Sequence, residues 1–534
     1  MGYKPLINIK NLTLSYLNKT FFENLSLSVG QGEIVAVIGA NGCGKTTLLD
    51  FILAAYTNEI DARREKNLII KGELFLAPKT RLAYLPQNLR GEIAGEGLYK
   101  ANMTSAIYKR LLEEFSLARL NYQERYREGK PIEDRDGEFL SEGERQKEAI
   151  AMVFGLLADV LLFDEPTNYL DIEGITVFEH ELEQAAARGC GMLLVSHDRS
   201  LINNVADKTV YLTPNGAYQT EGGFSAVWSL AGSDFEARQK EARVIRNKIT
   251  RLQTEMRTRM NWAAQKEKSK IGAGSEKPHI AKMAAKMASR AKAARNKADK
   301  EIKRLENTKP FIPKEVRLNF PKYRVRHREV FALQNIFFDY SLIGTDGERL
   351  KDFPMLLEHI DLAASTRDKL CLMGTNGAGK STLLKIILGE IRAQKGERCF
   401  NENVPIKYLP QGLARFFTEP RLIDNFRDTG CDETGVRSYL GSVLLRGDKV
   451  TEPVDRFSQG ELMRAGIVKC ILQQAEFLVL DEPTSHLDIE SVQVLERVLG
   501  AFPGGYLIIS HDRTFVENVA ERLYLLENGR IMMV

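Results

Sequence analysis

At 534 residues the chain is too long for a single hydrophobic core, and about three or four domains would be usual at this length. An apolar content of 43%, no run near the ~18 consecutive apolar residues of a membrane-spanning helix, and no apolar signal core in MGYKPLINIK favour a cytoplasmic protein. The net charge of +4 hides an asymmetry, because residues 234–309 hold 22 Lys or Arg against 9 Asp or Glu, which leaves −9 on the remainder.

The first motif in chain order is a glycine-rich loop between an apolar strand and an apolar helix. A strand predicted at Ile34–Ile38 runs into GANGCGKT at Gly39–Thr46. Glycines let backbone N–H groups approach phosphate oxygens, and the N-terminus of a helix favours their negative charge. We expect Lys45 to reach the β- and γ-phosphates of a nucleotide and Thr46 to hold Mg²⁺.

Four polar motifs follow this loop. Gln87 ends YLPQ, and Ser141 in LSEGE begins a helix whose N–H groups can bind an anion. The apolar strand in VLLFDEP delivers Asp164 to the metal and Glu165 to an attacking water, since in-line displacement needs a clamped metal and a positioned nucleophile. His197 in SHDR is a candidate contact for the γ-phosphate. Alone, such a serine is an ordinary helix cap and such a histidine is usually structural.

The middle segment combines helical periodicity with excess positive charge. Apolar residues recur at helical spacing over Phe235–Met256 and again over Met283–Leu305, on either side of a charged, glycine-containing stretch. We expect two antiparallel helices that form a hairpin with its tip near Trp262–His279.

A charge run on a coiled coil is often only a solvated face. An imbalance of +13 instead favours binding to the phosphates of a large RNA. The candidate RNA contacts are Arg259, Trp262, Lys266, Lys268, Lys270, Lys277, Lys282, Lys286 and Arg290. Trp262 can stack on a base or pack internally.

The polar motifs recur in the same order in the C-terminal part. The serine precedes the strand aspartate by 23 residues in both copies, from Ser141 to Asp164 and from Ser458 to Asp481. The nucleotide-binding candidates are Tyr16, Gly39, Asn41, Gly42, Gly44, Lys45, Thr46, Thr47, Gln87, Ser141 and Gly143 in the first copy, and Tyr340, Gly374, Asn376, Gly377, Gly379, Lys380, Ser381, Thr382, Gln411, Ser458 and Gly460 in the second. The candidate metal ligands are Thr46, Gln87, Asp164, Ser381, Gln411 and Asp481, and the catalytic candidates are Glu165, Glu482, His197 and His511. Because both glutamates are present, we expect both sites to hydrolyse ATP.

The two copies differ ahead of the glycine-rich loop. Tyr16 and Tyr340 can stack on adenine or serve as ordinary core or edge tyrosines. The interval from Tyr340 to Gly374 is 34 residues against 23 in the first copy, which predicts a longer hairpin around Ser341–Pro354.

The order of glycine-rich loop, glutamine, Ser-x-Gly-Glu, strand–Asp–Glu and histidine resembles the ATP-binding cassette (ABC) ATPases. The resemblance covers roughly Leu6–Gly223 and Phe331–Val534. It implies an α/β fold with two ABC-type P-loop ATPase domains, at 1–231 and 326–534, joined by a long α-helical hairpin linker at 232–325.

In that family two cassettes face head to tail and enclose two ATP molecules. By resemblance, Ser141 completes the site built on Lys380, and Ser458 completes the site built on Lys45. ATP then holds the cassettes together and hydrolysis releases them. The chain is expected to work as a monomer, with ATP and Mg²⁺ bound between its own two cassettes.

Two further stretches resemble the F subfamily of ABC proteins (ABC-F), whose tandem cassettes act on ribosomes. DEPTNYLD and DEPTSHLD are similar to the usual DEPTNHLD and depart from it at Tyr169 and Ser485. In the linker, KEKSK at Lys266–Lys270 and HIAKMAAKMASRAK at His279–Lys292 are similar to the antibiotic-resistance (ribosomal protection) branch, in its Lsa/Sal-like group.

This resemblance implies a protein that enters the ribosomal exit (E) site, with the linker tip near the peptidyl-transferase centre. There it would contact 23S rRNA and the P-site tRNA and dislodge lincosamides, streptogramin A or pleuromutilins. A general ABC-F translation factor without a resistance role, and the ATPase subunit of a transporter, are the alternatives.

Overall fold

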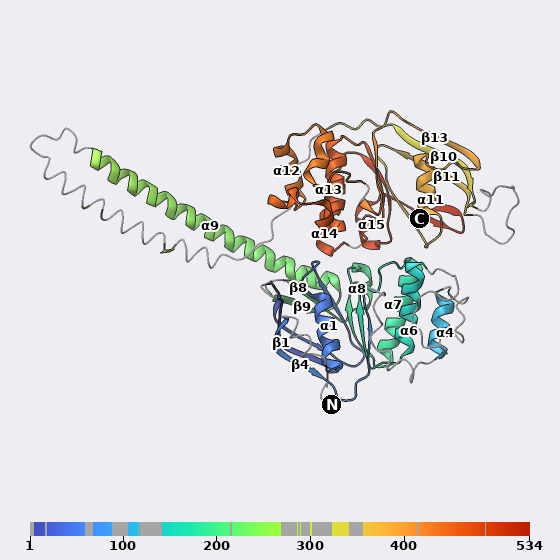
Figure 1. Ribbon diagram of the computed structural model, residues 1–534, viewed down its shortest axis with the longest axis horizontal. Coiled ribbons are helices and arrows are strands. Elements are labelled where there is room, and N and C mark those ends of the chain that lie inside the picture. The colour runs from blue at the N-terminus through green and yellow to red at the C-terminus, as the bar shows by residue number, and fades with distance from the viewer. Residues whose placement is uncertain are drawn as a thin grey trace, which may run out of the picture. The chain divides into compact units, whose positions relative to one another are not determined.

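The chain forms two compact units, Met1–Val227 with Val316–Val534, and Trp228–Glu315 (Figure 1). The computed structural model describes residues 5–16, 19–58, 68–87, 105–115, 117, 141–213, 216–268, 286, 289, 300–301, 323–340, 356–413, 416–485 and 487–534. The first unit holds two similar α/β cassettes, and the described part of the second is helical. Tandem cassettes with a helical region between them confirm the predicted fold class.

The first cassette is built on a six-stranded sheet with the order β5-β6-β7-β3-β8-β9. These strands are β3 (Ile34–Gly39), β5 (Leu82–Leu85), β6 (Val160–Asp164), β7 (Gly191–Val195), β8 (Lys208–Thr213) and β9 (Gly216–Glu221). All neighbours are parallel except β8 and β9. The carboxyl ends of β3, β6 and β7 therefore share one edge, where the residues that follow them meet.

Both faces of this sheet are covered, which explains its continuous apolar strands. One face packs on the helices α4 (Ser105–Glu114), α6 (Glu142–Gly155), α7 (Ile172–Ala187) and α8 (Arg199–Val205). The other face packs on α1 (Lys45–Tyr56) and on a separate antiparallel sheet. That sheet has the order β2-β1-β4 and consists of β1 (Ile7–Tyr16), β2 (Lys19–Val29) and β4 (Leu68–Leu76). Alternate residues of each parallel strand thus enter two different cores.

The second cassette repeats this plan. Its six-stranded sheet has the order β14-β15-β16-β12-β17-β18, and its antiparallel sheet has the order β11-β10-β13. The strands are β10 (Glu329–Phe338), β11 (Leu357–Ser365), β12 (Lys369–Gly374), β13 (Lys395–Phe400), β14 (Ile406–Leu409), β15 (Phe477–Asp481), β16 (Gly505–Ile509), β17 (Arg522–Glu527) and β18 (Arg530–Met533). The helices are α11 (Lys380–Leu388), α12 (Glu433–Ser442), α13 (Gln459–Leu472), α14 (Ile489–Ala501) and α15 (Arg513–Val519), with 3-10 turns at Ile423–Thr429, Gly447–Thr451 and Val454–Arg456. The longer hairpin predicted at 341–354 lies outside the described residues.

The basic segment begins with one long helix, α9 (Phe224–Lys268), drawn in green in Figure 1. Residues 286, 289, 300 and 301 are also helical, and Lys248 Nζ lies 3.5 Å from Glu301 Oε1 although 53 residues separate them. This contact places a returning helical residue beside α9, as a hairpin requires. The helix continues past Trp262 to Lys268, so the placement of Trp262 in the predicted tip (Trp262–His279) is wrong, and residues 269–279 of that tip lie outside the described residues. The following AAQKEK is rich in strong helix formers, which explains the extension.

No helix among the described residues combines the length and apolar character needed to cross a membrane.

Candidate active site

Each glycine-rich loop holds a buried lysine against its own carbonyl groups. Gly44 precedes α1 with φ 98°, and a Cβ atom there would lie 2.8 Å from the Cβ atom of Phe21. Glycine adopts this left-handed conformation without strain and leaves room for the neighbouring strand. Lys45 Nζ donates a hydrogen bond to the Gly39 carbonyl oxygen at 2.9 Å.

The second loop repeats this arrangement. Gly379 has φ 99°, and Lys380 Nζ donates to the carbonyl oxygens of Gly374 and Thr375 at 2.7 and 2.9 Å. Burial lowers the pKa of Lys380, with Glu482 acting in the opposite direction. In both loops the ammonium group is held at a helix N-terminus, so phosphates would gain a cation and helical N–H donors together.

A glutamate and a histidine face each other beyond each strand that ends in aspartate. In the first cassette His197 Nε2 lies 3.1 Å from Glu165 Oε1, and the backbone N–H of His197 donates to Glu165 Oε2 at 3.2 Å. In the second cassette His511 Nε2 lies 3.2 Å from Glu482 Oε1. Glu165 and Glu482 both have left-handed backbone, with φ 52° and 47°. Non-glycine residues persist in this region when the surrounding structure holds them there, which is typical of functional sites.

Burial sets the protonation of these groups. It raises the pKa of Glu165 to about 7 and that of Asp164 to about 6, with Lys45 opposing both shifts. Burial, reinforced by Lys45, holds the pKa of His197 well below its usual range. The imidazole is therefore neutral near pH 7, and the hydrogen bond that links the two residues is the one from the His197 backbone N–H to the glutamate. A buried glutamate with a pKa near neutrality is suited to accept a proton from water.

The candidate metal ligands line the same cavity as these pairs. Thr46, Gln87, Asp164, Ser381, Gln411 and Asp481 all line one cavity of about 1250 Å³. Both carboxylate oxygens of Asp164 are buried and accept no hydrogen bond within the described part of the chain. Hydroxyl, amide and carboxylate oxygens are the hard ligands that Mg²⁺ prefers, so each set fits that ion. No cluster of three His, Cys, Asp or Glu residues suited to another metal occurs among the described residues.

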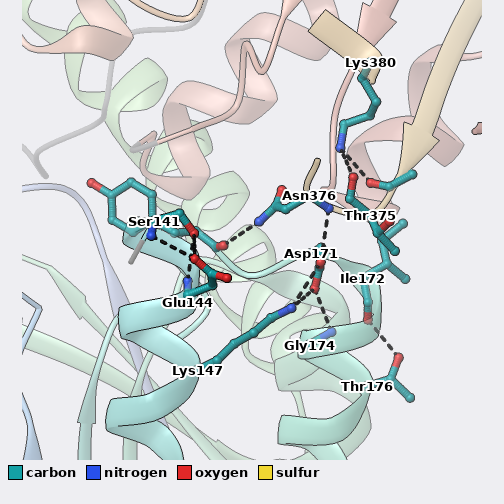
Figure 2. A network of polar contacts seen from close by, with 12 residues as sticks. Ser141, Glu144, Lys147, Asp171, Ile172, Gly174, Thr176, Thr375, Asn376 and Lys380 are labelled. Atoms are coloured by element: carbon teal, nitrogen blue, oxygen red, sulfur yellow. Dashed lines mark hydrogen bonds and ion pairs between the residues drawn. The ribbon is translucent and has the colours of Figure 1, made fainter. Parts of the chain in front are cut away.

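One side of the cavity joins the serine helix of the first cassette to the loop of the second (Figure 2). Asp171 Oδ2 accepts a hydrogen bond from the backbone N–H of Asn376 at 3.1 Å, and Asn376 Nδ2 donates to the Tyr169 carbonyl oxygen at 3.0 Å. Figure 2 shows Lys147 on the other side of Asp171, with Nζ 3.0 Å from Oδ1. A Cβ atom at Gly143 would lie 2.8 Å from the Tyr169 carbonyl oxygen, so glycine allows this close approach.

The opposite pairing occurs on the other side. Asp488 Oδ2 accepts a hydrogen bond from the backbone N–H of Asn41 at 2.9 Å. Ser141 and Ser458 each form a capping box with the glutamate three residues later. The structure therefore brings the loop of each cassette against the segment that follows the candidate catalytic glutamate of the other.

Sequence reasoning missed the residues that make this contact. The sequence predicts no role for Asp171, Asp488 or Lys147, and Tyr169 stands out there only as a departure from DEPTNHLD. The signal was available, because an aspartate closes both motifs seven residues after the metal aspartate.

Most nucleotide-binding candidates line the cavity, and five do not. These five are Tyr16, Gly39, Gly374, Ser458 and Gly460. Gly39 and Gly374 contribute carbonyl oxygens to the lysines instead. Tyr16 and Tyr340 are 44% and 49% exposed, but of the two only Tyr340 lines the cavity, and its hydroxyl lies 3.3 Å from Thr382 Oγ1.

The candidate RNA contacts are only partly described. Arg259, Trp262, Lys266 and Lys268 belong to α9, and Lys286 is helical and exposed. Lys270, Lys277, Lys282 and Arg290 lie outside the described residues.

Comparison with known proteins identifies both halves of the chain. The family model described as "ABC transporter" matches residues 22–168 and 357–485. Putative ATP-binding protein YdiF of Bacillus subtilis is 28% identical, over 98% of this chain and 80% of that protein. Ribosome protection protein VmlR of Bacillus subtilis is 26% identical, over 99% and 88%. ABC transporter F family member 5 of Arabidopsis thaliana is 27% identical, over 99% and 76%.

Solved structures support the same fold at lower sequence identity. An archaeal ribosome recycling factor, aABCE1, in complex with ribosomal stalk protein aP1, has a TM-score of 0.58 and 18% identity, over 97% of this chain and 89% of that chain. A structure titled RNase-L Inhibitor has a TM-score of 0.58 and 17% identity.

Proposed function

Because the chain belongs to the ABC transporter family through both of its cassettes, we propose that it is an ABC-F ATPase that acts on the ribosome. It hydrolyses ATP to ADP and phosphate at two sites, one built on Lys45 and one on Lys380. Its domains are the cassettes at 1–231 and 326–534 and the basic linker at 232–325. The observation that carries the proposal is the paired contact of each loop with the opposite cassette, at Asn41–Asp488 and Asn376–Asp171.

Hydrolysis follows from the groups at each site. Glu165 accepts a proton from water while the water oxygen bonds to the γ-phosphorus, and the bond from that phosphorus to the β–γ bridging oxygen breaks. A glutamate with a pKa near 7 is ionised for a large fraction of the time at neutral pH. His197 orients Glu165, and Lys45 neutralises charge on the phosphates. Glu482, His511 and Lys380 have the same roles at the second site.

Magnesium would be held by the hydroxyl, amide and carboxylate of Thr46, Gln87 and Asp164, and by Ser381, Gln411 and Asp481 at the second site. Bound there, the ion neutralises charge that develops on the phosphate oxygens.

Each nucleotide is enclosed by both cassettes. Ser141, which lines the cavity, and its helix N-terminus complete the Lys380 site, and we propose the same role at the Lys45 site for Ser458, although Ser458 does not line the cavity. ATP therefore favours the closed arrangement of the cassettes, and loss of phosphate weakens it. ATP binding and hydrolysis thus switch the protein between a form that binds the ribosome and a form that leaves it.

The charge distribution and the relatives support a ribosomal partner in the cytoplasm. Residues 234–309 carry a net charge of +13, whereas the rest of the chain carries −9. This distribution suits a linker that contacts RNA phosphates and cassettes that do not contact them. A protein named for ribosome protection is similar over nearly the whole chain. We propose that the protein enters the E site and that its linker extends toward 23S rRNA and the P-site tRNA. There it dislodges lincosamide, streptogramin A or pleuromutilin antibiotics.

The first experiment traps the ATP-bound form. A Glu165→Gln, Glu482→Gln variant binds ATP without hydrolysing it, so it should sediment with ribosomes in ATP and remain in the supernatant without nucleotide. Glu183→Gln, an exposed substitution of the same kind on α7, is the matched control and should behave like the natural chain. Equal sedimentation of the double variant with and without ATP would contradict the trapping mechanism.

The second experiment separates the resistance role from its alternatives. Expression in a susceptible bacterial host should raise the inhibitory concentration of a lincosamide and a pleuromutilin, and the double variant should abolish this protection. Ribosome trapping without any change in drug sensitivity would indicate a general translation factor. Co-purification with a membrane protein, without ribosome binding, would indicate a transporter subunit.

A further inference from the structure

Two arginines outside the cavity connect the cassettes. Arg199 and Arg513 begin α8 and α15, two residues after His197 and His511. Arg199 Nη2 lies 2.6 Å from Oε1 of Glu496 on α14, and the two residues are 297 positions apart in the chain.

The second arginine makes the corresponding contact in the opposite direction. Arg513 Nη1 lies 3.3 Å from Oε1 of Glu179 on α7. Each glutamate also accepts a hydrogen bond from its own cassette, Glu496 from Asn518 at 3.0 Å and Glu179 from Asn204 at 3.3 Å. Arginine, glutamate and asparagine thus form the same trio twice, and in each trio only the arginine comes from the other cassette.

The arginines lie among partly buried carboxylates. Asp198 and Asp512 cap α8 and α15 by accepting the N–H groups of Leu201 and Phe515, each at 2.9 Å. Arg199 Nη2 is also 3.8 Å from Asp512 Oδ1, across the boundary between cassettes. Burial raises the pKa of Asp512 to about 6, with Arg199 opposing the shift. Removing either arginine would therefore leave partly buried acidic groups without their opposite charge, which is unfavourable.

The two contacts differ in strength. The side chain of Arg199 is 4% exposed, whereas that of Arg513 is 26% exposed and divides its donors between Glu179, Thr176 Oγ1 at 3.0 Å and the Ile172 carbonyl oxygen at 3.5 Å. A buried ion pair is screened less than one near solvent. The Arg199–Glu496 pair should thus contribute more than its counterpart.

We propose that Arg199 and Arg513 are positioning residues. They hold α8 and α15, the helices that follow His197 and His511, against the opposite cassette. Neither arginine nor its glutamate partner lines the nucleotide cavity, so the pairs act through α8 and α15 rather than by touching ATP. Closure of the cassettes forms the pairs, and the pairs hold His197 and His511 against their glutamates. Assembly of each catalytic pair therefore depends on the opposite cassette as well as on bound nucleotide.

This inference rests on the proposed ATPase activity, and kinetics of the full-length chain can test it. The variants are Arg199→Met, Arg513→Met, Arg199→Glu, and the charge exchange that combines Arg199→Glu with Glu496→Arg. Arg437→Met is the matched control, because Arg437 pairs with Glu433 on the surface of α12 within a single cassette. For each variant, kcat and KM for ATP are measured, and thermal unfolding checks that the chain is folded.

Arg199→Met should lower kcat about tenfold, in line with the coupling expected for groups in contact across an interface, and Arg513→Met should lower it less. The exchanged pair should recover most of the loss suffered by Arg199→Glu alone, whereas Arg437→Met should leave kcat unchanged. Folded Arg199→Met and Arg513→Met chains with natural kcat would overturn the proposal, as would an exchanged pair no better than Arg199→Glu. If the natural chain itself hydrolysed no ATP, the proposed function would fail instead.

Discussion

Lys147 offers the sharpest test of how the two cassettes share a site. Its Nζ lies 3.0 Å from Asp171 Oδ1, while Asp171 Oδ2 accepts the N–H of Asn376 from the opposite loop. Burial alone would raise the pKa of Asp171, yet the hydrogen bond from Lys147 helps to hold it below its usual range. The aspartate is therefore ionised at neutral pH, and Lys147→Met would leave it facing Asn376 without its cation.

The size of the effect follows from burial. The side chains of Lys147 and Asp171 are 13% and 4% exposed, so solvent screens their interaction little. A hydrogen bond to a charged group is worth roughly 1.5–3 kcal/mol, and a loss of about 2 kcal/mol corresponds to about 30-fold in rate or affinity. We expect Lys147→Met to lower kcat/KM by about that factor at the Lys380 site.

The assay isolates one site at a time. Glu165→Gln disables the Lys45 site, so the remaining hydrolysis reports the Lys380 site that Asp171 completes. Glu482→Gln provides the reverse background. Lys147→Met should reduce steady-state hydrolysis about 30-fold in the first background and by less than about threefold in the second. Equal losses in both backgrounds would mean that the substitution destabilises the chain generally, and no loss in the first would refute the reasoning.

Two further predictions concern the loop and the catalytic glutamate. Gly44→Ala combines φ 98° with a Cβ atom 2.8 Å from that of Phe21. The substitution should therefore lower the free energy of unfolding by about 1–3 kcal/mol, measured by denaturant unfolding. It should also weaken nucleotide binding, measured by titration with a fluorescent ATP analogue. Gly189→Ala, which meets no atom within 4 Å but has φ 87°, is the control for backbone strain without the clash. Because burial raises the pKa of Glu165 to about 7, its basic form is lost as pH falls through that value, so kcat at saturating ATP should rise between pH 6 and 8. A rate constant that is flat over this range would contradict the assignment of Glu165 as the base.

The tandem fold was predictable because its signals are local. Glycines at Gly44 and Gly379, apolar strands that end in Asp164 and Asp481, and capping serines each depend on a few consecutive residues, and their repetition removed ambiguity. The end of α9 was harder to predict, since Trp262 is compatible with a turn or with a helix until the flanking residues are weighed.

Contacts between the cassettes could not be derived in the same way. Arg199 and Glu496 are 297 positions apart, and nothing in either local sequence specifies the other. Asp171 is also a normal N-cap for α7, accepting the N–H of Gly174 at 3.0 Å, so its local role concealed its contact with Asn376. When one carboxylate oxygen of such a residue caps its own helix, the local sequence does not reveal what the second oxygen binds.

The same contacts indicate that the two sites are not equivalent. Arg464 occupies the place of Lys147 in the second cassette, yet its Nη1 donates to Ser491 Oγ at 3.3 Å and its buried Nε has no partner within the described residues. The second cassette has Ser491 at the position where the first has Gly174. The backbone N–H of Ser491 donates to Asp488, which is the N-cap of α14. Asp488 therefore meets Asn41 without the direct lysine pair that Asp171 has. If both proposed sites bind ATP, their different buried charges predict different rates of nucleotide release, so a repeated motif set can still give an ordered cycle.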